Sequence, residues 1–177
     1  LFLDHEVRGD KLKVVVTTPG VFTDPPTVTL TQGGRDVPVA TTLTDVSTAI
    51  GYFPLPPRNS EERTIHADAG VNRHRVSAED RVDLYSVPTD RAGAFASARD
   101  AFSASYDSGA VFSPLHFTVD RKEESGRTVY EFGPRDILLN GGLTVSLPVP
   151  KDREGKAGLY YRSNSGWVLL NTRPGPL

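Results

Sequence analysis

The chain has 177 residues, of which 37% are hydrophobic and 24% charged, and its formal net charge is −2. This length allows one large domain or two small ones, and the balanced charge gives no basic field for a nucleic-acid backbone. No apolar run approaches the roughly 20 residues that cross a bilayer, so we expect no membrane insertion. The absence of Cys excludes disulfides, thiol nucleophiles and thiolate metal sites.

The composition also bears on processing and location. The sequence begins at Leu1 and contains no Met, so we interpret it as a mature or excised fragment. A Cys-free chain rich in Pro, Thr and Ser favours an extracytoplasmic location, secreted or at the cell surface.

Apolar and polar residues alternate with a period of two along most of the chain, which predicts β-strands. Strands are expected at residues 11–16, 27–31, 115–119 and 143–149, and near the C-terminus at 159–161 and 167–170. Turn residues separate them, including Gly33-Gly34, Ser125-Gly126 and Asn140-Gly141-Gly142. This rhythm is typical of antiparallel sheets and not of βαβ units.

Residues 90–106 fit two structures. Phe95, Ala98, Phe102 and Tyr106 fall at helical spacing, while Phe102, Ala104 and Tyr106 also alternate as in a strand. We favour two strands broken near residues 99–100, because every neighbouring segment is predicted to be β.

The strands divide into two sets, joined by the polar segment 88–93. We therefore predict two antiparallel β-sandwich domains in tandem, over residues 1–89 and 90–177. The first set has the strand spacing of an Ig-like sandwich.

Four segments of the second half resemble a ZU5-type β-sandwich: residues 109–112, 129–134, 143–148 and 166–170. The first half resembles the Ig-like modules that precede such domains in bacterial surface and secreted proteins. The resemblance implies a non-enzymatic interaction or spacer module, with no cofactor.

Motifs for metal or acid–base catalysis are lacking. The four His residues form no His-x-x-x-His pattern, and Asp4-His5-Glu6 is expected to be a solvated terminus, so we predict no metal site. The paired acids Glu61-Glu62, Glu79-Asp80 and Glu123-Glu124 lie beside Arg or Lys, as on a solvated surface. We therefore expect no enzyme.

One tripeptide carries an alternative activity. His116-Phe117-Thr118 resembles the His-Phe-Ser site at which some ZU5-type domains cleave themselves, which implies His116 as base, a scissile bond after Phe117 and Thr118 as nucleophile. Strand alternation instead predicts that Phe117 points into a core while His116 and Thr118 point to solvent.

Exposed aromatic rings give a binding alternative. In each of the pairs Tyr52-Phe53 and Tyr160-Tyr161, one ring should face the core and the other solvent. Tyr52 and Tyr160 are therefore candidates for stacking on a sugar. The main prediction remains a non-catalytic accessory module whose partner is another protein or an attached domain of the same chain.

Overall fold

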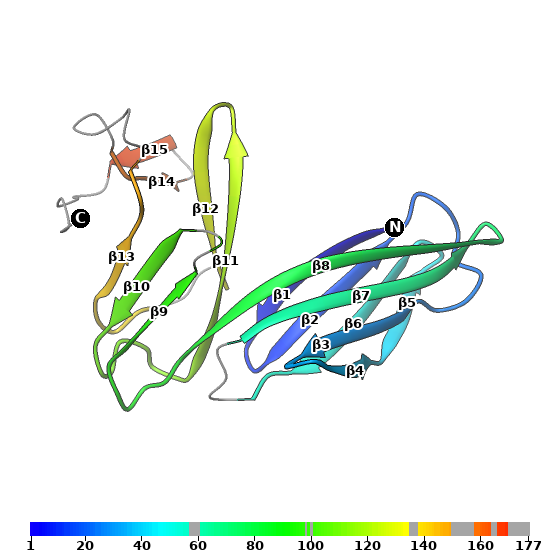
Figure 1. The fold of residues 1–177 in the computed structure, drawn as a ribbon, viewed down its shortest axis with the longest axis horizontal. Coiled ribbons are helices and arrows are strands. Elements are labelled where there is room, and N and C mark those ends of the chain that lie inside the picture. The colour runs from blue at the N-terminus through cyan, green and yellow to red at the C-terminus, as the bar shows by residue number, and fades with distance from the viewer. Residues whose placement is uncertain are drawn as a thin grey trace.

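The computed structural model describes residues 1–56, 61–97, 99, 101–134, 138–149, 158–163 and 166–169. These residues form strands and no helix, which confirms the all-β antiparallel class (Figure 1). The strands are β1 (Phe2–Arg8), β2 (Lys11–Thr17), β3 (Thr27–Gln32), β4 (Arg35–Val39), β5 (Thr41–Asp45), β6 (Thr48–Pro54), β7 (Glu61–Val71), β8 (His74–Val87), β9 (Gly93–Ser97), β10 (Phe102–Tyr106), β11 (Leu115–Glu124), β12 (Arg127–Gly133), β13 (Leu143–Ser146), β14 (Tyr160–Ser163) and β15 (Gly166–Leu169).

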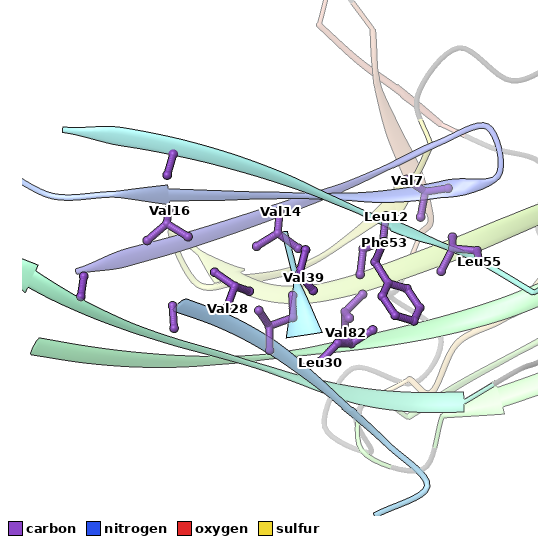
Figure 2. Packing of buried hydrophobic residues seen from close by; sticks show 14 of the residues in the cluster. Val7, Leu12, Val14, Val16, Val28, Leu30, Val39, Phe53, Leu55 and Val82 are labelled. Atoms are coloured by element: carbon purple, nitrogen blue, oxygen red, sulfur yellow. The ribbon is translucent and has the colours of Figure 1, made fainter. Parts of the chain in front are cut away.

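The first lobe consists of two sheets packed face to face. Sheet β1-β2-β6-β5 covers one face of the β8-β7-β3-β4 part of a six-stranded sheet. Alternate residues of these strands, β5 excepted, meet between the sheets in a mainly aliphatic core, shown in Figure 2. Leu12, Leu30 and Ile65 in this core are fully buried, and burial of such a side chain contributes about 1.5–3 kcal/mol.

The second lobe packs sheet β13-β10-β9 against β11, β12 and the end of β8. Its core is aromatic. Tyr85 stacks on Phe95 with ring centroids 4.7 Å apart and meets the edge of Phe102 at 5.6 Å. Phe117 also stacks on Phe95, with ring centroids 6.1 Å apart, so rings from β8, β9, β10 and β11 form one packed group.

Strand β8 belongs to both lobes and uses a different face in each. Leu84 lies in the aliphatic core and its neighbour Tyr85 in the aromatic one. Successive side chains of a strand point to opposite faces, so the two lobes cover opposite faces of one continuous sheet, β12-β11-β8-β7-β3-β4. The change of core therefore lies within β8, and the predicted joint at 88–93 falls between β8 and β9.

Most predicted strands are present. Segments 11–16, 27–31 and 115–119 lie in β2, β3 and β11, and residues 90–106 form β9 and β10 and not a helix. The strand predicted at 143–149 is wrong in length, because β13 ends at Ser146. Pro148 lacks the N–H that a longer ladder would need.

Among the described residues, three hairpins turn through pairs of residues with positive φ. Gly33-Gly34 joins β3 to β4, and Ser125-Gly126 joins β11 to β12, as their sequences predict. The β7–β8 hairpin turns at Asn72 (φ 49°) and Arg73 (φ 70°), the second of which usually requires Gly.

Candidate functional site

His116 on β11 forms a hydrogen bond between the two lobes. Its side chain is 3% exposed, and its Nε2–H donates to the backbone carbonyl oxygen of Pro56, 2.9 Å away, in the segment that follows β6. Arg63 of β7 lies on the same side of the sheet, fully buried, with its guanidinium 5.7 Å from the centre of the Phe53 ring. Burial lowers the pKa of His116 and the charge of Arg63 lowers it further, against the opposing effect of the Pro56 carbonyl.

The prediction that His116 and Thr118 point to solvent is wrong. Alternation does place both opposite Phe117, but the two side chains are only 3% and 7% exposed. Their face of β11 continues the face of β8 that carries Leu84, because Thr118 pairs with Leu84 and His116 with Ser86. The first lobe covers that face, so both faces of β11 are buried here.

A second contact joins the lobes on the opposite face. Asp83 of β8 is 9% exposed and lies 3.3 Å from Nη2 of Arg99, in the turn between β9 and β10. A buried carboxylate needs such a partner, because an uncompensated charge in a protein interior is costly. The β9–β10 turn is therefore held against β8 by charge as well as by the aromatic core.

Beyond this junction β8 and β11 separate. They pair only through residues 84–87 and 115–118, whereas β8 begins ten positions earlier at His74 and β11 continues to Glu124. We call the opening between residues 74–83 and 119–124 the fork; Figure 1 shows the two strands diverging. A hollow lies at the fork, lined by Glu79, Asp80, Arg81, Arg99, Asp120 and Arg121.

The charged side chains of the fork point to both faces of the sheet. Arg81 and Arg121 point to the face that carries Tyr85 and Phe117, since each stands an even number of residues from those rings. Asp80 and Asp120 point to the opposite face, where Asp80 meets Nδ1 of His5 at 3.0 Å. The arginine face also carries carboxylates: Glu79 lies 3.4 Å from Nδ1 of His66, and Glu123 lies 3.4 Å from Nη2 of Arg121.

The Phe117–Thr118 peptide lies where the β8–β11 ladder ends and the β11–β12 ladder begins. Phe117 pairs with Tyr85, and Thr118 pairs with Leu84 on one side and Gly133 on the other. The structure brings His116 and Thr118 to one face of β11, two residues apart. Self-cleavage there stays a prediction, and its chemistry would have to start from extended backbone.

The two sugar-binding candidates are not brought together. Tyr52 is 50% exposed on β6, while its neighbour Phe53 is buried, as alternation predicts. Tyr160 is 51% exposed on β14, in a separate two-stranded sheet. Tyr52 stands beside Lys13 on the outer face of the first lobe, in register with Glu6 beyond it.

The expectation for Asp4-His5-Glu6 is corrected: the tripeptide lies within β1, and the side chain of His5 is only 9% exposed against Asp80. Within the described part of the chain, no group of three or more His, Asp and Glu side chains is placed to hold a metal ion.

Sequence reasoning missed the roles of Arg81, Asp83 and Arg99. It grouped Glu79-Asp80 and the basic residues near Arg121 with the solvated surface. The sequence signal was weak. Residues 82–85 and 116–119 are buried at four consecutive positions, but Asp83, His116 and Thr118 interrupt the continuous apolar run that is typical of strands covered on both faces.

No protein-family model, curated protein or solved structure matches this chain. The ZU5-like and Ig-like resemblances therefore stay predictions. In the described residues, no helix is long and apolar enough to span a membrane.

Proposed function

We propose that this chain is a non-catalytic interaction or spacer module of a larger extracytoplasmic protein, built as an Ig-like sandwich followed by a ZU5-like one. The observation that carries the proposal is the sheet shared by both lobes. A flexible linker would let two sandwiches move independently. Here β8 runs through both cores, and the His116–Pro56 and Asp83–Arg99 contacts fasten the lobes on opposite faces of the sheet.

A fixed junction suits a module that holds attached parts at a set distance or presents loops and edges to a partner. Bending between the lobes would have to break the β8–β11 ladder and expose His116 together with the aromatic core. Each of those steps carries a free-energy cost, so the geometry between the lobes should be narrow in solution.

Distance measurements between spin labels test this proposal. The chain has no native Cys, so labels attach only where Cys is introduced. Arg35→Cys on β4 and Ser105→Cys on β10 place exposed labels on different lobes. Arg35→Cys with Ser77→Cys on β8 gives a control pair within the first lobe. The inter-lobe distance distribution should be as narrow as the control; a broad distribution would refute a rigid module.

Carbohydrate binding is the second candidate, favoured by the half-exposed ring of Tyr52 beside Lys13 on an open sheet face. An aromatic ring stacks on the apolar face of a sugar, and neighbouring charged groups bind its hydroxyls. A glycan array tests this with the parent protein, Tyr52→Ala, Tyr160→Ala and the ring-retaining Tyr52→Phe. Carbohydrate binding is supported if the parent and Tyr52→Phe bind a glycan and Tyr52→Ala does not. It is refuted if the parent binds no glycan on the array.

A further inference from the structure

We propose that Asn140 is a site of spontaneous deamidation, and that hydrogen bonds to residues 109–110 restrain the reaction in the folded chain. The backbone nitrogen of Gly141 attacks the side-chain carbonyl carbon of Asn140. A bond between these two atoms forms as the bond from that carbon to Nδ2 breaks, and ammonia leaves with the proton of the Gly141 nitrogen. Water then opens the five-membered imide at either carbonyl group, which gives Asp or isoaspartate. This modification goes beyond the proposed function and does not depend on it.

The residue that follows Asn140 favours this attack. Gly141 has no Cβ to crowd its backbone nitrogen, and both residues are exposed. The other Asn residues of the sequence precede Arg, Ser or Thr, whose side chains hinder the same attack. Asn140 is therefore the residue at which the local sequence most favours deamidation.

Three hydrogen bonds oppose the reaction in the folded chain. The backbone N–H groups of Asn140 and Gly141 both donate to the carbonyl oxygen of Ala110, at 2.8 and 3.3 Å. The side-chain Nδ2 of Asn140 donates to the carbonyl oxygen of Gly109, 3.1 Å away. The Gly141 nitrogen must lose its proton to attack, and the Asn140 side chain must turn toward it. Both contacts therefore have to break before the imide can form.

The opening that the reaction requires is local. Leu139, beside Asn140, is 42% exposed and is joined to Val111 by an isolated bridge. A segment with such contacts opens at a lower free-energy cost than a core strand does. The rate of deamidation should therefore follow the release of this segment from residues 109–110 and not the unfolding of the whole chain.

Deamidation would prevent the segment from docking again. Nδ2 of Asn140 is the donor to Gly109, and the Asp product has acceptor oxygens in its place, so a carboxylate would face a carbonyl oxygen. The N–H of Gly109 in turn donates to the carbonyl oxygen of Thr89, at 2.9 Å. The change would therefore loosen the end of the second lobe, where the connections after β8, after β10 and before β13 meet.

Mass spectrometry of the whole chain, kept at neutral and at mildly alkaline pH, tests the site. Each deamidation adds one mass unit, and peptide mapping assigns it to a residue and separates isoaspartate from Asp. The same chain unfolded in guanidinium chloride gives the rate without docking. We expect Asn140 to react roughly ten- to a hundredfold more slowly in the folded chain, as hydrogen bonds of the usual net strength would cause.

Gly141→Ala separates the chemistry from the fold. The backbone of Gly141 lies outside the left-handed region, and a Cβ there would lie 3.4 Å from its nearest neighbour, the Cα of Ala110, which is an ordinary contact. The variant keeps the backbone N–H and crowds its nitrogen. Deamidation of Asn140 should therefore slow by about tenfold in the folded and the unfolded chain alike.

Asn140→Asp reproduces one product and tests the loosening. Amide hydrogen exchange at Gly109 and at residues 140–141 should become about tenfold faster than in the parent. Asn72→Asp is the matched control, because Oδ1 of Asn72 accepts a hydrogen bond from the N–H of Val21 and Asp keeps that acceptor. It adds the same charge and should leave the exchange at these amides unchanged.

Equal rates in the folded and the unfolded chain would overturn the restraint. A folded chain without modification after several times the expected period would overturn the site. A mass gain that peptide mapping assigns to another Asn, or that Gly141→Ala does not slow, would overturn it as well. Unchanged exchange in Asn140→Asp would overturn the loosening. None of these outcomes alters the inter-lobe distance distribution, which tests the proposed function separately.

Discussion

Leu84 and Tyr85 are neighbours in β8 that support different cores, so replacing each by Ala tests whether the two lobes unfold as one unit. Leu84 is fully buried among aliphatic residues, and Tyr85 is 8% exposed between Phe95 and Phe102. Leu→Ala in a core costs about 2–5 kcal/mol, and loss of a large buried aromatic side chain costs about 3–5 kcal/mol. For a chain of this size each kcal/mol lowers Tm by about 2–4 °C.

Both variants should therefore melt roughly 4–20 °C below the parent, and each should do so in one transition, because the shared sheet couples the cores. Differential scanning calorimetry measures this, with the ratio of calorimetric to van't Hoff enthalpy as the criterion for one unit. Ser77→Ala, at an exposed position of the same strand, is the control and should change Tm little. Two transitions, of which Leu84→Ala moves one and Tyr85→Ala the other, would refute the coupling.

Further predictions concern single sites. The pKa of His116 is lowered from 6.5 in the folded chain, so as the pH falls the unfolded chain takes up the proton first. The free energy of unfolding should therefore fall as the pH drops below about 6.5. Urea unfolding at several pH values measures this, and His116→Gln should reduce the dependence of stability on pH. Intact mass after prolonged storage tests cleavage between Phe117 and Thr118: we expect one undivided chain, and two fragments that vanish in Thr118→Ala would establish cleavage. Arg73→Gly should raise stability by about 1 kcal/mol, because Arg at φ 70° is strained; an unchanged or lower unfolding midpoint in urea would contradict it.

Local patterns accounted for much of the fold. Val28 and Leu30 point inward and Thr29 outward because β-strand geometry alternates, whatever the strand packs against. Likewise Phe102 and Ala104 are buried and Ser103 exposed, which settles the helix-or-strand question over residues 90–106. Paired turn residues such as Gly33-Gly34 also mark a hairpin without any knowledge of its surroundings.

The candidate site was less accessible to the same reasoning. Arg81, Arg99 and Arg121 come from three different elements, β8, the β9–β10 turn and β11, and nothing in their local sequence indicates that they line one hollow. The charge pattern around them is the one that an ordinary solvated surface has. They lie together because β8 and β11 stop pairing at this place and leave a hollow between them.

His116 shows where the two kinds of information divide. Its sequence neighbourhood assigns it correctly to the face opposite Phe117, since that depends only on the two-residue period of the strand. Whether that face meets water depends on what packs against it. Here the first lobe covers the face, and His116 donates a hydrogen bond to the Pro56 carbonyl. Alternation is a property of the local backbone, whereas burial of the second face arises from contacts between segments distant in the chain, which a periodic pattern does not encode.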